Sequence, residues 1–321
     1  MKILSTTGNG DLARVYVADM GQKRYVEFVE SVQPPVPREE KWVLIISTLF
    51  GCPVGCSMCD AGGGGYHGAL TKDEMLGQID HLIRSRFPDG SVTIPKLKVQ
   101  FARMGEPALN HAVTDVLLEL PKRYHAPGLL PCISTVAPAA REPFFARLKR
   151  IKDTFYPNGQ FQLQFSIHTT DKKKRDELIP IRKWTFDQIA RYGRSFREGG
   201  DRKITLNFAL AKDMPVDPKI LLRHFHPEDF LIKITPLNPT VRLQKSGLQS
   251  YIDPNSAGNY PIATELEDQG FEVLVSIGEL EENQIGSNCG QYIQHYLSSK
   301  NKVEGAYQAA GEMEKEEIVS L

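Results

Sequence analysis

The sequence predicts an α/β fold, namely a partial (β/α)6 barrel of the TIM type with an N-terminal β-hairpin extension. Two observations lead to this prediction. Short apolar runs alternate with amphipathic helical segments from residue 42 onward, and parallel strands need such crossover helices between them. Six of these units follow one another, whereas eight close a complete barrel.

The elements follow in chain order. Residues 13–33 hold two alternating β-runs that turn at Met20-Gly21, which indicates the hairpin, and residues 34–40 form a polar connector. Thr71 and Glu74 make a capping box at the start of the first helix. The expected strands are 42–48, 97–102, 131–136, 162–168, 204–210 and 230–237, with a further run at 271–277, and the later helices lie near 110–120, 139–152, 184–198, 217–225 and 259–269. We expect three parts: the hairpin extension and linker at 1–40, the barrel at 41–300 and a charged tail at 301–321.

Composition narrows the class of protein. Lys and Arg together number 39, as do Asp and Glu, whereas an obligate nucleic-acid binder is more often basic overall. No apolar stretch approaches the roughly 20 residues that span a bilayer, and the N-terminus turns polar too early for a signal peptide. Five cysteines, three of them clustered, argue against a secreted disulfide framework. We expect a cytoplasmic protein with a metal or redox site.

The cysteine cluster is Cys52, Cys56 and Cys59, with C-x3-C-x2-C spacing, directly after the first barrel strand. A structural zinc site wants four closed ligands, and His67 is the only candidate nearby for the fourth. Iron–sulfur clusters are held by thiolates, and three thiolates leave one iron of a 4Fe–4S cluster open. The pattern therefore favours a 4Fe–4S cluster over a degenerate zinc loop or three structural thiols.

Further motifs follow the other strands, where parallel α/β folds collect their active residues. With the cysteine loop, the segments "VQFARMGEPALN", "STVAP", "SIHTTDKKKRDELIPI", "ITPLNP" and "GSNCGQ" resemble, in the same order, the motifs of the RlmN/Cfr family. These are radical S-adenosylmethionine (SAM) methyltransferases acting on adenine in ribosomal or transfer RNA. The resemblance runs from about residue 13 to residue 295. It implies a radical SAM type of barrel, with a 4Fe–4S cluster and SAM as cofactors.

The resemblance assigns cofactor contacts by position. Gly105 and Glu106 of "MGEP" should meet the amino group of the SAM methionine, for which a carboxylate is a natural partner. The other positions implied to contact SAM are Ser134, Ser166, Ile167, His168 and Asn238.

The resemblance also assigns chemistry to two further residues. Cys289 matches the cysteine that takes a methyl group from one SAM; a radical derived from a second SAM then activates that methyl for addition to adenine. Without the motif, Cys289 would be a buried small hydrophobe. Glu30 aligns with the implied base that removes the ring proton, and Glu27, on the opposite strand face, is its rival.

The sequence departs from the family in several places. Ile45 stands where the family has the cysteine that resolves the protein–RNA crosslink. Cys132 is a substitute for it or a core cysteine, the latter being the commoner case. The chain begins near the hairpin, without the N-terminal helical domain of the bacterial rRNA enzymes, and it has "GELEENQ" where the family has a basic stretch. The basic runs are 147–152, 171–175 and 181–183, which form either one patch or solvated helix faces.

Three hypotheses follow. The first is a radical SAM methyltransferase that modifies carbon 2 or 8 of an adenine in RNA, reduced by an external donor such as flavodoxin or ferredoxin, monomeric and not bound to a membrane. The second keeps this chemistry but gives it a free nucleotide, another small molecule or a protein as substrate. The third is a non-catalytic iron–sulfur protein, in which the cluster is structural or senses redox state.

Overall fold

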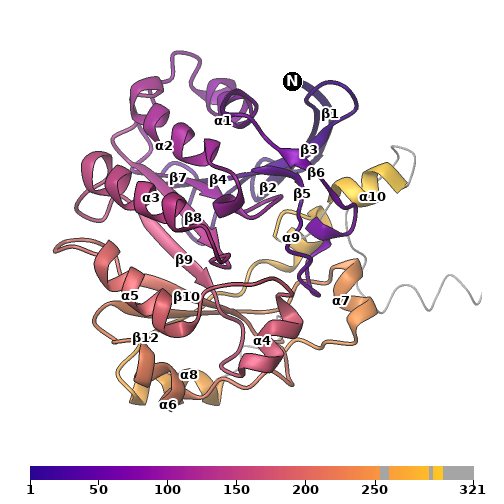
Figure 1. Ribbon diagram of the computed structural model, residues 1–321. Helices are drawn as coiled ribbons and strands as arrows, with labels where there is room; N and C mark the ends of the chain where they lie inside the picture. The colour runs from indigo at the N-terminus through magenta and orange to yellow at the C-terminus, as the bar shows by residue number, and fades with distance from the viewer. Residues whose placement is uncertain (254–259, 289–291, 299–321) are drawn as a thin grey trace, which may run out of the picture.

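The computed structural model describes residues 1–253, 260–288 and 292–298, in which ten strands form one mixed sheet (Figure 1). The first four strands pair antiparallel, and β4 and the six strands that follow it in the sheet pair parallel. The order across the sheet is β1 (Lys2–Gly8), β2 (Ala13–Asp19), β3 (Tyr25–Ser31), β4 (Lys41–Ile46), β7 (Lys96–Phe101), β8 (Leu129–Thr135), β9 (Gln162–Ser166), β10 (Ile204–Ala209), β11 (Phe230–Thr235) and β12 (Glu272–Val275).

The predicted α/β class with a mostly parallel sheet is confirmed. The hairpin is β2 and β3, but β3 also pairs with β4, so the hairpin continues the main sheet and covers the edge of β4. Four short helices were missed, at Lys172–Leu178, Val241–Ser246, Leu280–Ile285 and Tyr292–Ser298. Two strand features were also missed. The first is β1, a largely exposed edge strand with a weak alternating pattern, and the second is the short hairpin of β5 (Leu49–Gly51) and β6 (Tyr66–Ala69) around the cysteine loop. The run at 271–277 is β12, a seventh parallel strand.

Helices cover one face of this sheet. Figure 1 shows α1, α2, α3 and α5 along the outer side of the strands, with α4, α7 and α9 near the ends to which the parallel strands lead. Thr71 and Glu74 form the predicted capping box of α1, since each side chain accepts a hydrogen bond from the backbone of the other. The helices are α1 (Lys72–Arg86), α2 (Ala112–Arg123), α3 (Glu142–Phe155), α4 (Lys172–Leu178), α5 (Phe186–Phe196), α6 (Pro218–His224), α7 (Val241–Ser246), α8 (Pro261–Asp268), α9 (Leu280–Ile285) and α10 (Tyr292–Ser298).

The two faces of the sheet differ in chemistry, because successive side chains of a strand point to opposite faces. The helix-covered face is apolar: Trp42 and Leu44 on β4 and Leu97 and Val99 on β7 are fully buried. Burying each such side chain stabilises the fold by about 1.5–3 kcal/mol. The opposite face, which we call the polar face, carries Lys41, Ile45, Lys96, Lys98, Gln100, Cys132, Ser134, Gln164, Ser166, Asn207, Lys233 and Thr235.

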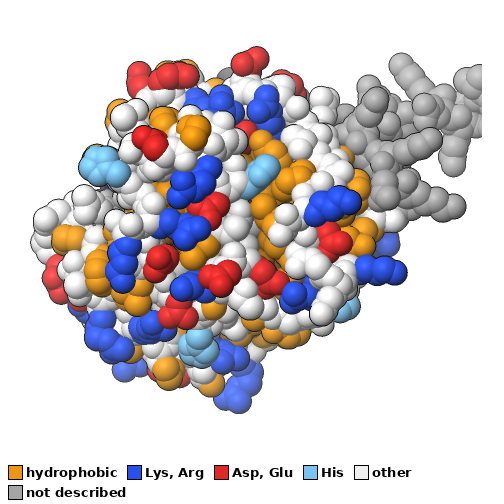
Figure 2. Space-filling view, turned by 90° about the horizontal axis from the view of Figure 1, so that it is seen from above, with side chains coloured by type: hydrophobic (Ala, Val, Ile, Leu, Met, Phe, Trp, Pro, Cys, Tyr) orange, Lys and Arg blue, Asp and Glu red, His pale blue; other side chains and the backbone are white. Residues whose placement is uncertain are grey.

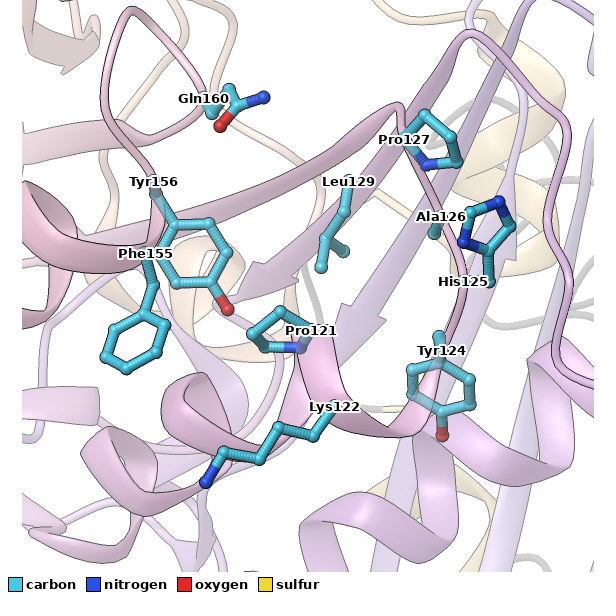
Figure 3. A pocket seen from close by; sticks show the side chains of 10 residues that line it. All are labelled: Pro121, Lys122, Tyr124, His125, Ala126, Pro127, Leu129, Phe155, Tyr156 and Gln160. Carbon is cyan, nitrogen blue, oxygen red and sulfur yellow. The ribbon is translucent and has the colours of Figure 1, made fainter.

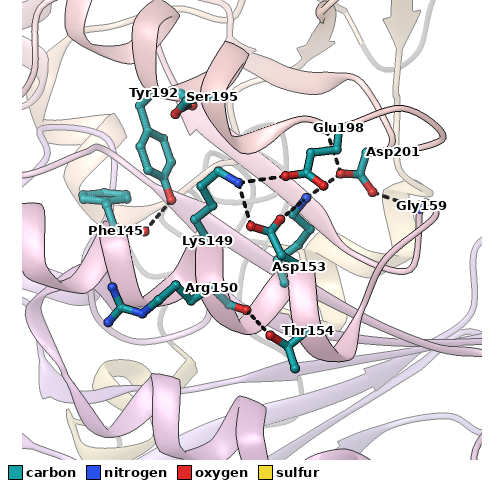
Figure 4. A network of polar contacts seen from close by, with 11 residues as sticks. Phe145, Lys149, Arg150, Asp153, Thr154, Gly159, Tyr192, Ser195, Glu198 and Asp201 are labelled. Carbon is teal, nitrogen blue, oxygen red and sulfur yellow. Dashed lines mark hydrogen bonds and ion pairs between the residues drawn. The ribbon is translucent and has the colours of Figure 1, made fainter.

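The predicted basic runs are used within the fold. In α3, Lys152 is 1% exposed and its Nζ lies 2.5 Å from Asp201, while Lys149 contacts Asp153 at 2.6 Å and Glu198 at 3.1 Å (Figure 4). In the other two runs, Arg175 is buried and donates to a backbone carbonyl, and Lys183 pairs with Asp176. These runs therefore use part of their charge within the fold, and Arg150, Lys172, Lys173 and Arg182 remain exposed. Within the described ranges, no helix is long and apolar enough to cross a membrane.

Candidate functional site

The cysteine loop begins at a turn that only glycine fits. Gly51 has a φ of +77°, and a Cβ placed on it would lie 1.8 Å from the carbonyl oxygen of Gly65. Just before it, the amides of Thr48 and Leu49 donate to the carbonyl of Met104, at 2.7 and 3.1 Å. The loop is therefore held directly against the "MGEP" turn that follows β7.

The thiols lie in partly apolar surroundings. Cys52, Cys56 and Cys59 are half-buried, and the first two pack against a small cluster that includes Val54 and Ile179. Burial raises the pKa of Cys52 to about 11, an effect opposed by backbone N–H groups that hydrogen bond to its sulfur. Donors aimed at the sulfur favour the thiolate, which is the form that binds iron. The loop therefore fits an iron–sulfur cluster.

A single metal ion fits the described residues less well. Among them, no three His, Cys, Asp or Glu side chains are grouped so that they could hold one ion. The thiolates of a cubic cluster bind different iron atoms, so they need not converge on one point.

Asp60, which the sequence reading passed over, fixes the far end of the loop. Its carboxylate is 4% exposed and accepts from the amides of Val241 at 3.0 Å and Arg242 at 2.8 Å, the first turn of α7. Thr240 caps the same helix and donates to the carbonyl of Met58 at 2.9 Å. The cysteine loop is thus joined to the "PLNP" turn after β11. An acidic residue directly after the last cysteine was the available signal.

The "MGEP" turn places a buried carboxylate beside this loop. Gly105 has a φ of +99°, and a Cβ there would lie 2.5 Å from the side chain of Leu49. Glu106 is 4% exposed and accepts hydrogen bonds from Thr135 Oγ1 at 2.5 Å and the amide of Val136 at 2.8 Å.

Glu106 has no cationic partner in the described part of the chain, although its hydrogen bonds join the ends of β7 and β8. Burial raises its pKa to about 6. An ammonium group brought to this carboxylate would stabilise its charged form. The carboxylate therefore fits the amino group of a bound amino-acid moiety.

The remaining predicted cofactor residues lie at the ends of successive strands. Ser134 and Ser166 are half-buried on the polar face, at the ends of β8 and β9. Ile167 follows β9 and is fully buried, so only its backbone is available for a direct polar contact. Asn238 is half-buried after β11, and its carbonyl accepts from the amide of Thr240 at 2.8 Å.

His168 is held in one tautomer. It is 7% exposed with a φ of +64°, and its Nδ1 accepts a hydrogen bond from the amide of Ala209 at 3.0 Å. Burial, with the charge of Arg175 nearby, lowers its pKa to about 3. The ring is therefore neutral with its proton on Nε2, so it acts as a hydrogen-bond donor.

The structure separates the two candidate bases. Glu30 points to the helix-covered face, where its carboxylate accepts from Tyr16, Trp42 and Arg86 at 2.9–3.2 Å. Glu27 points to the polar face, at the level of the residues that follow β4. Glu30 is therefore not brought together with the cofactor residues, and its role as a base stays a prediction.

Glu27 belongs to a buried ion pair with Arg103, which precedes "MGEP". Glu27 Oε1 lies 2.8 Å from Arg103 Nε, and both side chains are at most 2% exposed. Arg103 also donates to the carbonyls of Gly286 at 2.5 Å and Ser287 at 2.9 Å. Glu27 Oε2 accepts from the amide of Ile293 at 2.7 Å. One ion pair therefore contacts the chain on both sides of position 289.

Cys289 itself lies outside the described residues. The acidic run before it does not form a separate surface. Glu279 and Glu282 form the capping box of α9, and Glu281 accepts a hydrogen bond from Asn9. Burial and the charge of Glu279 raise the pKa of Glu282 to about 7. These carboxylates thus start a helix.

A hollow of about 500 Å³ lies elsewhere (Figure 3). It is lined by residues from the ends of α2 and α3 and by Leu129, the first residue of β8. It therefore lies at the opposite ends of the strands from the cysteine loop, and it holds none of the predicted site residues.

Comparison with known proteins gives this arrangement a context. No protein-family model matches the chain. A protein of Desulfitobacterium hafniense (strain Y51) named probable dual-specificity RNA methyltransferase RlmN is 28% identical over 258 residues, 78% of this chain and 67% of the relative. The chain is similar to the RlmN methyltransferases. A second probable RlmN, from Petrotoga mobilis (strain DSM 10674 / SJ95), is 24% identical over 84% of this chain and 75% of its own length.

The fold comparison agrees with the RlmN similarity. A radical SAM methyltransferase from Sphaerobacter thermophilus superposes with a TM-score of 0.66 and 20% identity, covering 90% of this chain and 80% of that chain. The resemblance predicted from the motifs is confirmed by these relatives, and the mixed, mostly parallel sheet is of the same kind.

Ile45 stands at the position that the resemblance assigns to the resolving cysteine, so its neighbours on the sheet show whether another cysteine lies near it. Ile45 lies opposite Gln100 on β7, and Gln100 lies opposite Cys132 on β8. All three face the polar face, with Cys132 two strands, about 10 Å, from Ile45. Cys132 is fully buried, and Gln164 Nε2 donates to its sulfur at 3.0 Å. This burial fits a core cysteine, and the role of Cys132 as a substitute for the resolving cysteine stays a prediction.

Proposed function

We propose that the chain is a radical SAM methyltransferase that methylates an sp2 carbon, carbon 2 or 8 of an adenine in RNA. The observation that carries the proposal is the joining of three motif loops at one end of the sheet. The cysteine loop bonds to the "MGEP" turn through Met104 and to the "PLNP" turn through Asp60. The names of the similar proteins supply the substrate class.

Cys52, Cys56 and Cys59 would hold a 4Fe–4S cluster, and Glu106, Ser134, Ser166, His168 and Asn238 would hold SAM beside it. Together the cluster and SAM supply a carbon-centred radical and the methyl group when they are bound. A purely structural cluster gives no reason for a buried carboxylate beside the cysteine loop that has no cationic partner among the described residues, so the third hypothesis is disfavoured.

The protein's own residues have distinct roles in this proposal. Glu106 would receive the amino group of SAM, and the Nε2–H of neutral His168 would donate a hydrogen bond to SAM. Cys289 accepts the methyl group, with its chain segment anchored on both sides by Glu27 and Arg103. Of the two candidate bases, Glu27 is better placed than Glu30, because only Glu27 points to the polar face.

We also propose that the sheet forms a partial barrel open on one side. Burial lowers the pKa of Lys233, and repulsion from Lys98 adds to this effect, although β7 and β11 are separated by three strands. In a flat sheet these strands would lie about 19 Å apart. The interaction therefore supports a curved sheet whose polar face lines the interior.

The second candidate substrate is a small molecule, a nucleotide or a protein. It is favoured by the partial neutralisation of the basic runs and by the face drawn in Figure 2, where Lys and Arg alternate with Asp and Glu. The proposal further includes an external electron donor such as flavodoxin or ferredoxin, a monomeric state and a cytoplasmic location.

The test is anaerobic incubation of the reduced, SAM-loaded protein with RNA and, separately, with free adenine nucleotides, followed by mass spectrometry of the nucleosides. We expect methyladenine from RNA with the wild type and none with Cys289→Ala, which retains its iron. Cys56→Ala should lose both the iron and the brown colour. SAM cleavage without methyladenine from either substrate would overturn the assignment.

A further inference from the structure

The polar face of the sheet carries a cluster of lysines drawn from separate strands. Lys41 begins β4, Lys96 and Lys98 lie on β7, and Lys233 lies on β11, all four half-buried and on the same face. Arg202 and Lys203, just before β10, add two more cations at the end where the parallel strands begin. The cluster does not appear as a run of basic residues in the sequence, because it consists of alternate residues from strands that are far apart in the chain.

This charge is poorly balanced by the protein. Lys203 pairs with Glu272 at 3.3 Å, and Lys41 donates to the amide oxygen of Gln33. In the described part of the chain, Lys96, Lys98 and Lys233 make no ion pair with a carboxylate. The cluster therefore holds unbalanced positive charge in partly buried surroundings, which costs free energy unless an anion joins it.

The titration of the lysines reflects the same imbalance. Burial, together with repulsion from neighbouring lysines, lowers the pKa of both Lys41 and Lys233 to about 8. Lys98 and Lys96 repel Lys41, and Lys98 repels Lys233, so the four side chains form one electrostatic group.

The cluster extends to the level of the predicted cofactor residues. Lys233 lies opposite Asn207, which lies opposite Ser166 at the end of β9. The charge of Lys98 repels both Lys233 and Lys41. The positive charge therefore runs along the polar face from the beginning of the strands to the row that contains Ser166.

We propose that this lysine cluster is a binding site for the phosphate groups of the substrate, so that the reacting base lies at the strand ends and its phosphates lie on the polar face. The proposal rests on the proposed function, because it deepens the substrate class to a phosphorylated nucleoside unit. Several ammonium groups with few carboxylates match a polyanion rather than a single carboxylate, and lysine binds phosphate as a point charge.

The test is isothermal titration of the full-length protein with inorganic tripolyphosphate at low salt. The variant is Lys98→Met/Lys233→Met, and the matched control is Lys23→Met/Lys122→Met, which removes the same number of charges from exposed positions. We expect tight binding by the wild type and the control, and a loss of about tenfold for each removed cluster lysine. Added salt should weaken the wild-type binding.

Unchanged binding in Lys98→Met/Lys233→Met, or equal loss in the control, would overturn the proposal. Folding is not at risk from this variant, since removing unbalanced charge should leave its melting temperature equal to or above that of the wild type. Lys41→Gln offers an independent check and should weaken binding in the same direction.

Two further titrations test whether the lysine cluster binds the phosphate groups of RNA, of a free nucleotide, or of both. A short RNA oligonucleotide and adenosine triphosphate are each compared with adenosine. In both comparisons, only the affinity for the phosphorylated ligand should depend on Lys98 and Lys233. These titrations need neither the iron–sulfur cluster nor SAM. Phosphate binding can therefore fail while methyl transfer is observed, and methyl transfer can fail while phosphate binding is observed.

Discussion

At the scale of single residues, Glu106 makes the proposed contact with the amino group of SAM. Its carboxylate accepts three hydrogen bonds from the chain, so a glutamine in its place keeps most of the local structure. What the amide loses is the charge that would meet an ammonium group. The residue thus separates a structural role from a ligand-binding role.

We expect Glu106→Gln to assemble its cluster but to bind SAM about tenfold to a hundredfold more weakly, because one charge-assisted contact is lost. Calorimetric titration with SAM measures this. Since burial raises the pKa of Glu106 to about 6, wild-type SAM affinity should fall as the pH drops through 6 and the carboxylate becomes protonated. The variant should lack this pH dependence. Equal affinity and the same pH profile in both proteins would contradict the role of Glu106.

At the scale of elements, the Glu27–Arg103 pair joins β3, the "MGEP" turn and the segments on both sides of position 289. Removing one partner of such a buried pair leaves an uncompensated charge, which costs about 3–5 kcal/mol. Removing both should cost less than the sum of the single changes.

We expect Arg103→Met to lower the free energy of unfolding by about 3–5 kcal/mol, and Glu27→Gln/Arg103→Met to recover part of that loss. Denaturant unfolding of the single and double variants measures this coupling. If the anchoring also positions Cys289, the double variant should keep its cluster and still methylate Cys289 more slowly than the wild type. Strictly additive losses in the cycle would show that the pair does not act as a unit.

The motifs were predictable from sequence because they are local. The cysteine spacing, the "MGEP" turn and the capping box at Thr71 each lie within a few residues, and all take their expected places. The orientation of Glu30 was harder, because it depends on which residue of β3 pairs with which residue of β4. A register shift of one residue would exchange the faces of Glu27 and Glu30.

Contacts between distant segments could not be predicted. Asp60 bonds to residues 241 and 242, and Arg103 to residues 286 and 287, so neither partner is visible in a local pattern. A buried arginine does demand a carboxylate partner, but nothing local to Arg103 singles out Glu27. The basic runs could be interpreted only as one patch or as solvated helix faces, and the structure places Lys149, Lys152 and Lys183 in ion pairs. The unbalanced lysines of the polar face could not be predicted as a group, because they come from three separate strands.

At the scale of the whole molecule, the lysine cluster makes stability depend on pH. Burial and repulsion from Lys98 lower the pKa of Lys233 from its ordinary value of 10.5 to about 8. Lys41 also interacts with Lys233 by repulsion, and Cys132 acts in the opposite direction. The unfolded chain then binds this proton more tightly than the folded protein does. The penalty is complete below pH 8, and it is relieved as the pH rises from 8 to 10.5.

We expect Lys233→Met to be more stable than the wild type at pH 7, by about 1–2 kcal/mol, and the difference to shrink between pH 8 and 10.5. Denaturant unfolding across this pH range measures it, with Lys122→Met as the exposed control. A constant difference across the range would show that Lys233 titrates normally in the folded protein.

The central claim, that the chain is a methyltransferase which carries its methyl group on Cys289, is tested most directly by intact-protein mass. The protein is expressed anaerobically with its cluster assembled, and its peptides are then mapped. We expect a mass increase of one methyl group, about 14 Da, on the peptide that contains Cys289. An unmodified Cys289 in protein that carries its cluster and cleaves SAM would contradict the claim.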